Sequence, residues 1–243
     1  TATYNTFIGS RTAYNLTTGS NNTFLGSHSG YSTTTGALNV ALGDHALYDN
    51  TTGAQNTAVG RAALANNTTG NSSVAVGQDS LNTATSAIYN VAIGQQSLRT
   101  TSTGGQNVAV GYSALRYYTG HDSVAIGAYA GEYATSGNNI SIGSQAGRNY
   151  TSGANNISIG ILAGATGQSN QYNVAVGSYS LRYVTGNYNT AVGGLSLGAT
   201  TSGARNTALG YDSGKAITTG AYNTFLGERA GAATTTALNN TVV

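Results

Sequence analysis

The sequence contains no cysteine, proline, methionine or tryptophan, and charged residues make up only 7% of its 243 residues. Without cysteine, the chain can form neither disulfide bonds nor thiolate metal sites. The formal net charge of +2 is too small to predict binding to nucleic acid or to an anionic membrane surface. Apolar runs stay far below the roughly 20 residues that cross a bilayer, so membrane insertion is not expected.

The residues that are present follow a regular pattern. A glycine closes a short aliphatic run every 16 or 17 residues from Gly9 to Gly227, and a fifteenth copy begins at Asn240. A repeat of this regularity indicates an array of one small structural unit. We therefore expect residues 1–243 to be a single β-solenoid array, and a segment of a longer fibre.

Each copy has the same parts, as the run Asn107-Val108-Ala109-Val110-Gly111 illustrates. The β-branched run is too short for a helix and predicts a strand. A second short strand is expected near Ala114-Leu115, followed by a polar turn that is often Thr-Thr-Gly. The sequence thus predicts an all-β fold, a parallel β-solenoid or β-roll of about 15 coils with 16–17 residues per coil and strands about 4.8 Å apart.

An asparagine stands four residues before the glycine in most copies. At the same corner of every coil, its amide can bond to the next asparagine and to the backbone of the turn. This predicts a structural ladder made of Asn5, Asn22, Asn39, Asn56, Asn90, Asn107, Asn139, Asn156, Asn173, Asn189, Asn206, Asn223 and Asn240, with Ser73 and Ser123 as the exceptions.

Alternation along the strand places Val108 and Val110 on one face and Ala109 on the other, and both faces are apolar. Strands of this kind are normally buried on both sides. We expect the valine face to line the coil interior and the alanine face to meet identical rows on partner chains. The predicted oligomer interface consists of Ala41, Ala58, Ala75, Ala92, Ala109 and Ala125.

The motif Asn-Thr-Ala-Val-Gly-x-x-Ala-Leu-x-x-x-Thr-Thr-Gly, which begins at Asn56, resembles the repeats of phage tail fibres. The run Ser123–Ala130 is also similar to the head repeats of YadA-like trimeric autotransporter adhesins, although those repeats have a shorter turn. The resemblance implies a parallel homotrimer, intertwined or side by side, with left-handed coils and a role in attachment. It also implies an extracellular location, on a virion tail fibre or a bacterial cell surface.

Residues able to support catalysis are scattered. The seven acidic residues fall on different coils, except for Asp44 and Asp49, which share one. His28, His45 and His121 also lie on different coils. Asp44 next to His45 could indicate a metal site or a catalytic dyad, but neighbours in a strand point to opposite faces. The sequence therefore predicts no enzyme activity, no cofactor and no metal.

Aromatic residues in the turns form the one predicted binding surface. Stacked tyrosine and arginine side chains present a flat, amphipathic surface that suits sugars or proteins. The candidate residues are Arg116, Tyr117, Tyr118, Tyr133, Tyr150, Arg182 and Tyr183. The alternative is a stacking ladder that only stiffens the array, as is expected for Tyr14, Tyr31 and Tyr48.

The favoured function is that of a structural and adhesive fibre segment that attaches to a host cell or surface. Its expected partners are two further copies of the chain and a cell-surface glycan or protein receptor. Two alternatives remain open. The recurring Thr-Thr turns could order water in an ice-binding β-solenoid, and the array could be a tailspike that binds or degrades polysaccharide.

Overall fold

The computed structural model describes all residues from 1 to 243 and divides into two units, Thr1–Asp122 and Ser123–Val243. Both units consist of short strands and turns, and neither contains a helix. The first unit contains β1 (Thr6–Ile8), β2 (Thr23–Leu25), β3 (Val40–Leu42), β4 (Thr57–Val59), β5 (Val74–Val76), β6 (Val91–Ile93) and β7 (Val108–Val110). The second contains β8 (Val124–Ile126), β9 (Ile140–Ile142), β10 (Ile157–Ile159), β11 (Val174–Val176), β12 (Thr190–Val192), β13 (Thr207–Leu209), β14 (Thr224–Leu226) and β15 (Thr241–Val242).

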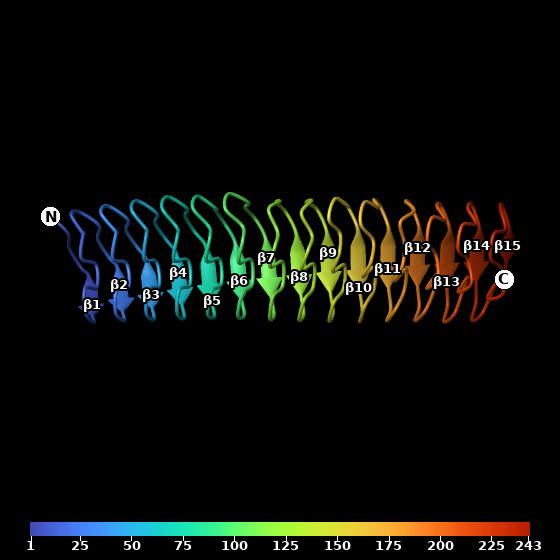
Figure 1. Cartoon of the computed structure of the whole chain (residues 1–243), viewed down its shortest axis with the longest axis horizontal. Helices are drawn as coiled ribbons and strands as arrows, with labels where there is room; N and C mark the ends of the chain where they lie inside the picture. The colour runs from blue at the N-terminus through green and yellow to red at the C-terminus, as the bar shows by residue number, and fades with distance from the viewer. The chain divides into compact units, whose positions relative to one another are not determined.

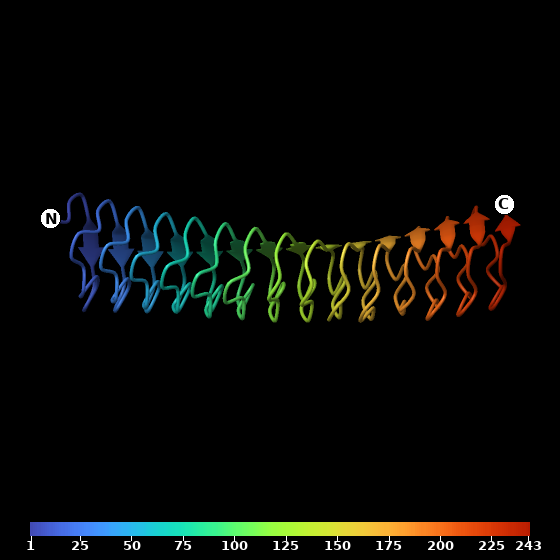
Figure 2. The same ribbon diagram turned by 90° about the horizontal axis from the view of Figure 1, so that it is seen from above.

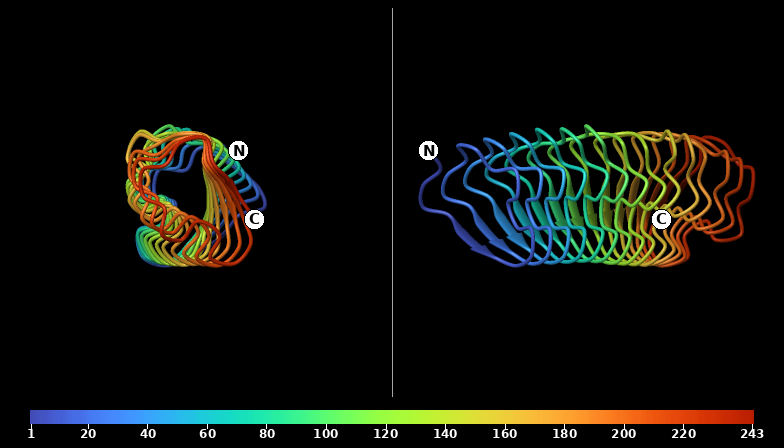
Figure 3. Two further views of the ribbon diagram at one scale, coloured as in Figure 1. Left: turned by 90° about the vertical axis from the view of Figure 1, so that its right-hand side faces the viewer. Right: turned by 60° about the vertical axis from the view of Figure 1, so that its left-hand side comes forward.

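Within each unit, every strand pairs in parallel with the strands of the preceding and following coils, so the predicted parallel β-solenoid is confirmed. Each unit forms one row of strands along one side of its coils (Figures 1 and 2). Seen end-on, the chain of each coil traces a single loop (Figure 3). Equivalent repeat positions face one another, as in the pairs Val74–Val91, Ala75–Ala92 and Val76–Ile93. The coils therefore stack in register.

The second strand predicted near Ala114-Leu115 is wrong, because these residues lie in a turn spanning 112–117. The backbone there alternates in handedness, with a φ of 54° at Ser113 and 49° at Leu115. It still bonds to the preceding coil: the Ser113 N–H donates to the Gln95 carbonyl, and the Leu98 N–H donates to the Ala114 carbonyl, both at 3.0 Å. A compact turn thus stacks as regularly as a strand, although it lacks the extended conformation.

The alanine row lies inside the coil and not on an outer face. Ala41, Ala58, Ala75, Ala92, Ala109 and Ala125 are 0–1% exposed within the chain itself. The predicted oligomer interface at these residues is therefore wrong, because an alanine already covered by its own coil cannot contact a partner. Successive strand side chains do alternate between two faces, but the alanine face is the inner one. Val108 and Val110 therefore point outward and are only partly buried.

Phenylalanine enters the interior in two coils, and in both a glycine makes room for the ring. Phe24 takes the place of the strand alanine and is fully buried, and Gly30, six residues later, replaces the leucine found at Leu47 in the next coil. A Cβ atom at Gly30 would lie 2.3 Å from the Phe24 ring. Phe225 and Gly231 repeat this exchange, with a distance of 2.2 Å. In these two coils, a ring at one position is thus matched by the absence of a side chain at the other.

The asparagine ladder forms as predicted. The Oδ1 atom of each asparagine accepts the backbone N–H of its counterpart in the next coil; for example, the Asn22 N–H donates to Asn5 at 2.8 Å and the Asn223 N–H donates to Asn206 at 3.1 Å. The Nδ2 group donates to a carbonyl in the following turn, as from Asn206 to Gly220 at 2.8 Å. At Ser73 and Ser123, Oγ accepts the N–H of Asn90 and Asn139, and the Ser73 hydroxyl also donates to the Asn71 carbonyl at 3.4 Å. These bonds join the strand to the turn and each coil to the next.

Replacing Asn206, which is fully buried, should therefore destabilise the second unit. Asn206→Ala leaves the Asn223 N–H and the Gly220 carbonyl without their partners, at a cost of about 2–4 kcal/mol. Asn206→Ser should lose less, because serine keeps the acceptor, as Ser73 and Ser123 do. Urea unfolding followed by circular dichroism measures both variants, and equal stability of Asn206→Ala and wild type would contradict the ladder's role.

Because Phe24 occupies the space that a side chain at position 30 would need, substitutions at these two positions should compensate each other. Phe24→Ala should cost about 3–5 kcal/mol through the cavity it leaves, and Gly30→Leu should destabilise through its clash with the ring. The double variant recreates the alanine–leucine pair of Ala41 and Leu47, so it should be more stable than either single variant. Thermal unfolding of the four proteins tests this, and simple additivity of the two losses would rule out a shared interior volume.

Candidate functional site

The outward face of the strands is the most extensive exposed apolar feature of each unit. The first and third residues of nearly every strand are β-branched or aliphatic and partly or fully exposed. Exposed members in the first unit include Ile8, Leu25, Val40, Leu42 and Ile93, and those in the second include Ile126, Ile140, Ile159, Leu209 and Leu226. We call this surface the strand face.

Chemically diverse side chains occupy the turn that follows each strand glycine. The second and fifth residues after the glycine differ from coil to coil, whereas the buried positions between them remain alanine, serine, leucine or glycine. In the first unit, these two positions hold His28 and Tyr31 in one coil and His45 and Tyr48 in the next. Because equivalent positions stack, residues of similar chemistry on successive coils form columns.

An aromatic column runs along the turns of the first unit. The rings of Tyr14, Tyr31 and Tyr48 stack at centroid distances of 5.4 and 5.2 Å. Beside them, the imidazoles of His28 and His45 stack at 5.0 Å, and His45 lies 5.0 Å from Tyr48. The predicted tyrosine stack is thus present, and it continues into a histidine pair.

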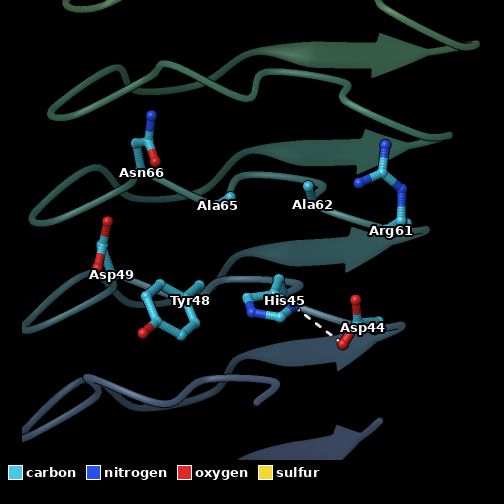
Figure 4. A pocket seen from close by; sticks show the side chains of 8 residues that line it. All are labelled: Asp44, His45, Tyr48, Asp49, Arg61, Ala62, Ala65 and Asn66. Carbon is cyan, nitrogen blue, oxygen red and sulfur yellow. Dashed lines mark ion pairs between the residues drawn. The ribbon is translucent and has the colours of Figure 1, made fainter. Parts of the chain in front are cut away.

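A shallow recess adjoins the column (Figure 4). One coil contributes Asp44, His45, Tyr48 and Asp49, and the next contributes Arg61, together with Ala62, Ala65 and Asn66. Partial burial raises the pKa of the Asp49 carboxyl. Arg61 reaches toward Asp79 on the following coil, with 3.6 Å between the charged groups.

The prediction that Asp44 and His45 point to opposite faces is wrong. The Asp44 carboxylate lies 2.9 Å from Nδ1 of His45 (Figure 4). The expectation of opposite faces assumed a strand, but the two residues lie in a turn, where His45 has a φ of 57°. A turn with alternating handedness lets adjacent side chains meet.

In the second unit, arginine and tyrosine side chains form two similar clusters. Arg148 lies over the rings of Tyr129 and Tyr133, at 5.2 and 5.5 Å, and bonds to the buried carboxylate of Glu132 at 2.7 Å. Burial lowers the pKa of the Arg148 guanidinium, but the interactions with Glu132 and Tyr133 together raise it above its ordinary value. The second cluster places Arg182 over Tyr179 and Tyr183, at 5.3 and 4.9 Å.

The predicted binding residues divide into two groups. Tyr117, Tyr133 and Tyr183 are exposed at the surface, and Arg116 and Arg182 are partly exposed beside them. Arg116 lies over the ring of Tyr117 at 4.9 Å. For Tyr118 and Tyr150 the prediction of a surface position is wrong, because both are fully buried.

Tyr118 and Tyr150 are core residues with satisfied hydroxyl groups. The Tyr118 hydroxyl donates to the His121 carbonyl at 2.8 Å, and the Tyr150 hydroxyl bonds to Ser158 at 2.6 Å. Burial raises the pKa of Tyr150 to about 12. Both residues occupy a position that other coils fill with Val184 or Ile217, which identifies it as part of the interior. Comparing the coils at this position is the sequence signal that could have shown it.

The carboxylates are largely committed to ion pairs within the chain. Besides the pairs of Asp44, Asp79 and Glu132, Asp212 pairs with Lys215 at 3.1 Å. Pairs of carboxylates that face a common substrate are what most glycosidases require. Three of the seven acidic residues, Asp79, Glu132 and Asp212, thus pair with an arginine or lysine, and Asp44 contacts His45.

In the Thr-Thr turns, the hydroxyl of the first threonine forms a hydrogen bond to the next coil. Thr17, Thr34 and Thr51 each donate their hydroxyl to the carbonyl of the equivalent residue in the next coil, at 2.9–3.1 Å. The second threonine of these turns, at Thr18, Thr35 and Thr52, is exposed. A single column of exposed threonines thus runs along this edge of the first unit.

No family model, curated protein or solved structure matches the chain. The structure also contains no helix able to span a lipid bilayer. The fold therefore defines the class of protein, a parallel β-solenoid repeat array, and function is inferred from its surfaces.

Proposed function

We propose that the chain is a structural and adhesive segment of an extracellular fibre, in which three copies associate through their strand faces. The observation that carries the proposal is the row of exposed aliphatic side chains on the strands of each unit. Contiguous apolar surface of this kind is rare on soluble monomers and marks interaction sites. The number of copies and the location, on a virion tail fibre or bacterial surface, come from the resemblance of the repeat.

A second copy of the chain is the occupant that best suits this face. The strand face repeats the same short unit in every coil, with parallel strands spaced about 4.8 Å apart. A partner with the same spacing can place an aliphatic residue against each repeat, whereas a partner without it would match only locally. The strand face also carries no charged residue, so two copies meet without like-charge repulsion.

Lysines on the strand face should therefore dissociate the assembly. The double variant Val76→Lys and Ile93→Lys places two charges at adjacent coils of the first unit, at outward-facing positions. We expect the association constant to fall at least about hundredfold, because an unpaired ammonium group costs more to bury than the roughly 1–3 kcal/mol of an unpaired neutral polar group. Light scattering coupled to size-exclusion chromatography measures the change from trimer to monomer.

The matched control is Thr69→Lys with Ser86→Lys, which adds the same charge to exposed turn positions just before β5 and β6. This variant should remain trimeric, and all variants should retain the far-UV circular dichroism of the wild type. A wild-type chain that stays monomeric at high concentration would refute the proposal, as would equal behaviour of the two lysine variants.

The adhesive role is supported by the exposed arginine and tyrosine clusters of the second unit. Tyr133, Tyr179 and Tyr183 are 37–45% exposed, and arginines hold two clusters of rings in place. Flat aromatic rings beside cationic donors suit the faces and hydroxyl groups of sugars. We propose a cell-surface glycan as the receptor class.

Removing these rings should weaken glycan binding about tenfold or more, since each aromatic contact contributes roughly 1 kcal/mol. The test is the triple variant Tyr133→Ser, Tyr179→Ser and Tyr183→Ser on an array of bacterial surface polysaccharides. The control replaces Tyr172, Tyr188 and Tyr222 by serine, which are exposed on the turn before the strand. Unchanged binding by the first variant, or loss only in the control, would exclude these clusters as the receptor site.

The other two functions have weaker support. Ice binding by the threonine turns would use one column of exposed hydroxyl groups, since the partner hydroxyls are bonded to the next coil. A polysaccharide-degrading tailspike would need two carboxylates facing one substrate, and the three acidic residues outside the ion pairs of the chain, Asp49, Asp122 and Glu228, lie on three different coils.

A further inference from the structure

His28, His45 and Asp44 converge on the side of the first unit, away from the strands. Their potential ligand atoms lie within 4.8 Å of one another. The residues come from two consecutive coils, because His28 and His45 are each the second residue after the strand glycine, at Gly26 and Gly43. Stacking of the coils thus brings together two imidazoles that are separated in sequence.

Each imidazole is oriented by the side chain that precedes it. Nδ1 of His28 lies 2.9 Å from Oγ of Ser27, and Nδ1 of His45 lies 2.9 Å from the Asp44 carboxylate. A tautomer of His28 that donates its Nδ1–H to Ser27 leaves Nε2 available for a cation, while Nδ1 of His45 and the Asp44 oxygen are close enough to share that cation. Tyr31 and Tyr48 support the rings from the side, at 5.6 and 5.0 Å.

The position is open to a solvated ion. The side chains of His45 and Asp44 are 44% and 50% exposed, and the coil that follows carries only a methyl group, at Ala62, in the histidine column. The nearby cation Arg61 extends toward Asp79, whereas the recess holds Asp44 and Asp49 (Figure 4). The carboxylates therefore favour a positive ligand here.

We propose that His28, His45 and Asp44 form a binding site for a divalent transition-metal ion of the zinc type, which goes beyond the proposed fibre function. Imidazole nitrogen and carboxylate oxygen are ordinary zinc ligands, at about 2.0–2.2 Å. A tetrahedral ion needs its ligand atoms roughly 3.4 Å apart at these bond lengths, so exposed side chains must close by on the order of 1–1.5 Å. Water completes the coordination, and the bound ion links two coils.

The chain has few other residues that could bind zinc. The chain contains no cysteine and only three histidines. The third, His121, accepts the Gly105 N–H through Nδ1 at 3.0 Å and is absent from the cluster. A metal titration of the tag-free chain therefore tests this one site.

Isothermal titration calorimetry with zinc chloride at pH 7.5 should show one zinc ion bound per chain. His28→Ala and His45→Ala should each weaken binding at least tenfold, and Asp44→Ser should weaken it measurably. Each substitution introduces a residue that another coil already has at the same position. Ala62 stands at the histidine position with a φ of 55°, and Ser27 stands at the Asp44 position. The variants should therefore fold, as circular dichroism will verify.

His121→Ala is the control with the same loss of one imidazole, and it should bind zinc like the wild type. Zinc should also raise the unfolding temperature of the wild type but not of His45→Ala, because a ligand of the native state stabilises it. Absence of zinc binding at millimolar concentration overturns the site. Undiminished binding by the histidine variants, or equal loss in His121→Ala, overturns it as well.

Discussion

The stacking of equal coils in register depends on the hydrogen bonds that pass from one coil to the next at the same corner. Asn206 illustrates the arrangement, since its single amide joins the next strand, through the Asn223 N–H, to the following turn, through the Gly220 carbonyl. A buried backbone group that is not paired costs free energy, so a coil of a different shape would leave both groups unsatisfied. Serine at Ser73 and Ser123 maintains the register, because its Oγ accepts the same N–H from the next coil.

The narrow interior is the second constraint, and it determines which residues face outward. A coil that closes around Ala58 and Leu64 has no room for a second layer of branched side chains, so the valines and isoleucines of the strand lie on the outside. Where Phe24 or Phe225 enters the interior, glycine replaces the facing leucine. The exposed apolar strand face is therefore a direct consequence of a core built from small residues, and it is this face that the proposed association of copies would cover.

The repeat period, the strands and the asparagine ladder could be predicted from the sequence, because each depends on local and periodic features. The inside and outside of the strand could not, since Val108-Ala109-Val110 is apolar on both faces and alternation does not state which face is covered. The turn at Leu115 was mistaken for a strand because a leucine with a φ of 49° gives no signal in a single copy. Comparing coils would have helped with Tyr118 and Tyr150, whose counterparts Val184 and Ile217 are plainly core residues.

In this fold, function can vary without disturbing structure because the two use different positions of the coil. The asparagine, the small strand residue and the buried turn residues are held constant by hydrogen bonding and volume. The second and fifth residues after the glycine lie mostly at the surface, although Glu132 and Asp212 are buried, and they include histidine, arginine, aspartate and tyrosine. Stacking at about 4.8 Å then turns a change in two adjacent copies into a pair of side chains close enough to act together. His28 and His45 form such a pair in the first unit, and Arg182 with Tyr179 forms a similar contact within one coil of the second. The proposed metal site would thus need changes in only two coils, on a surface that the core does not use.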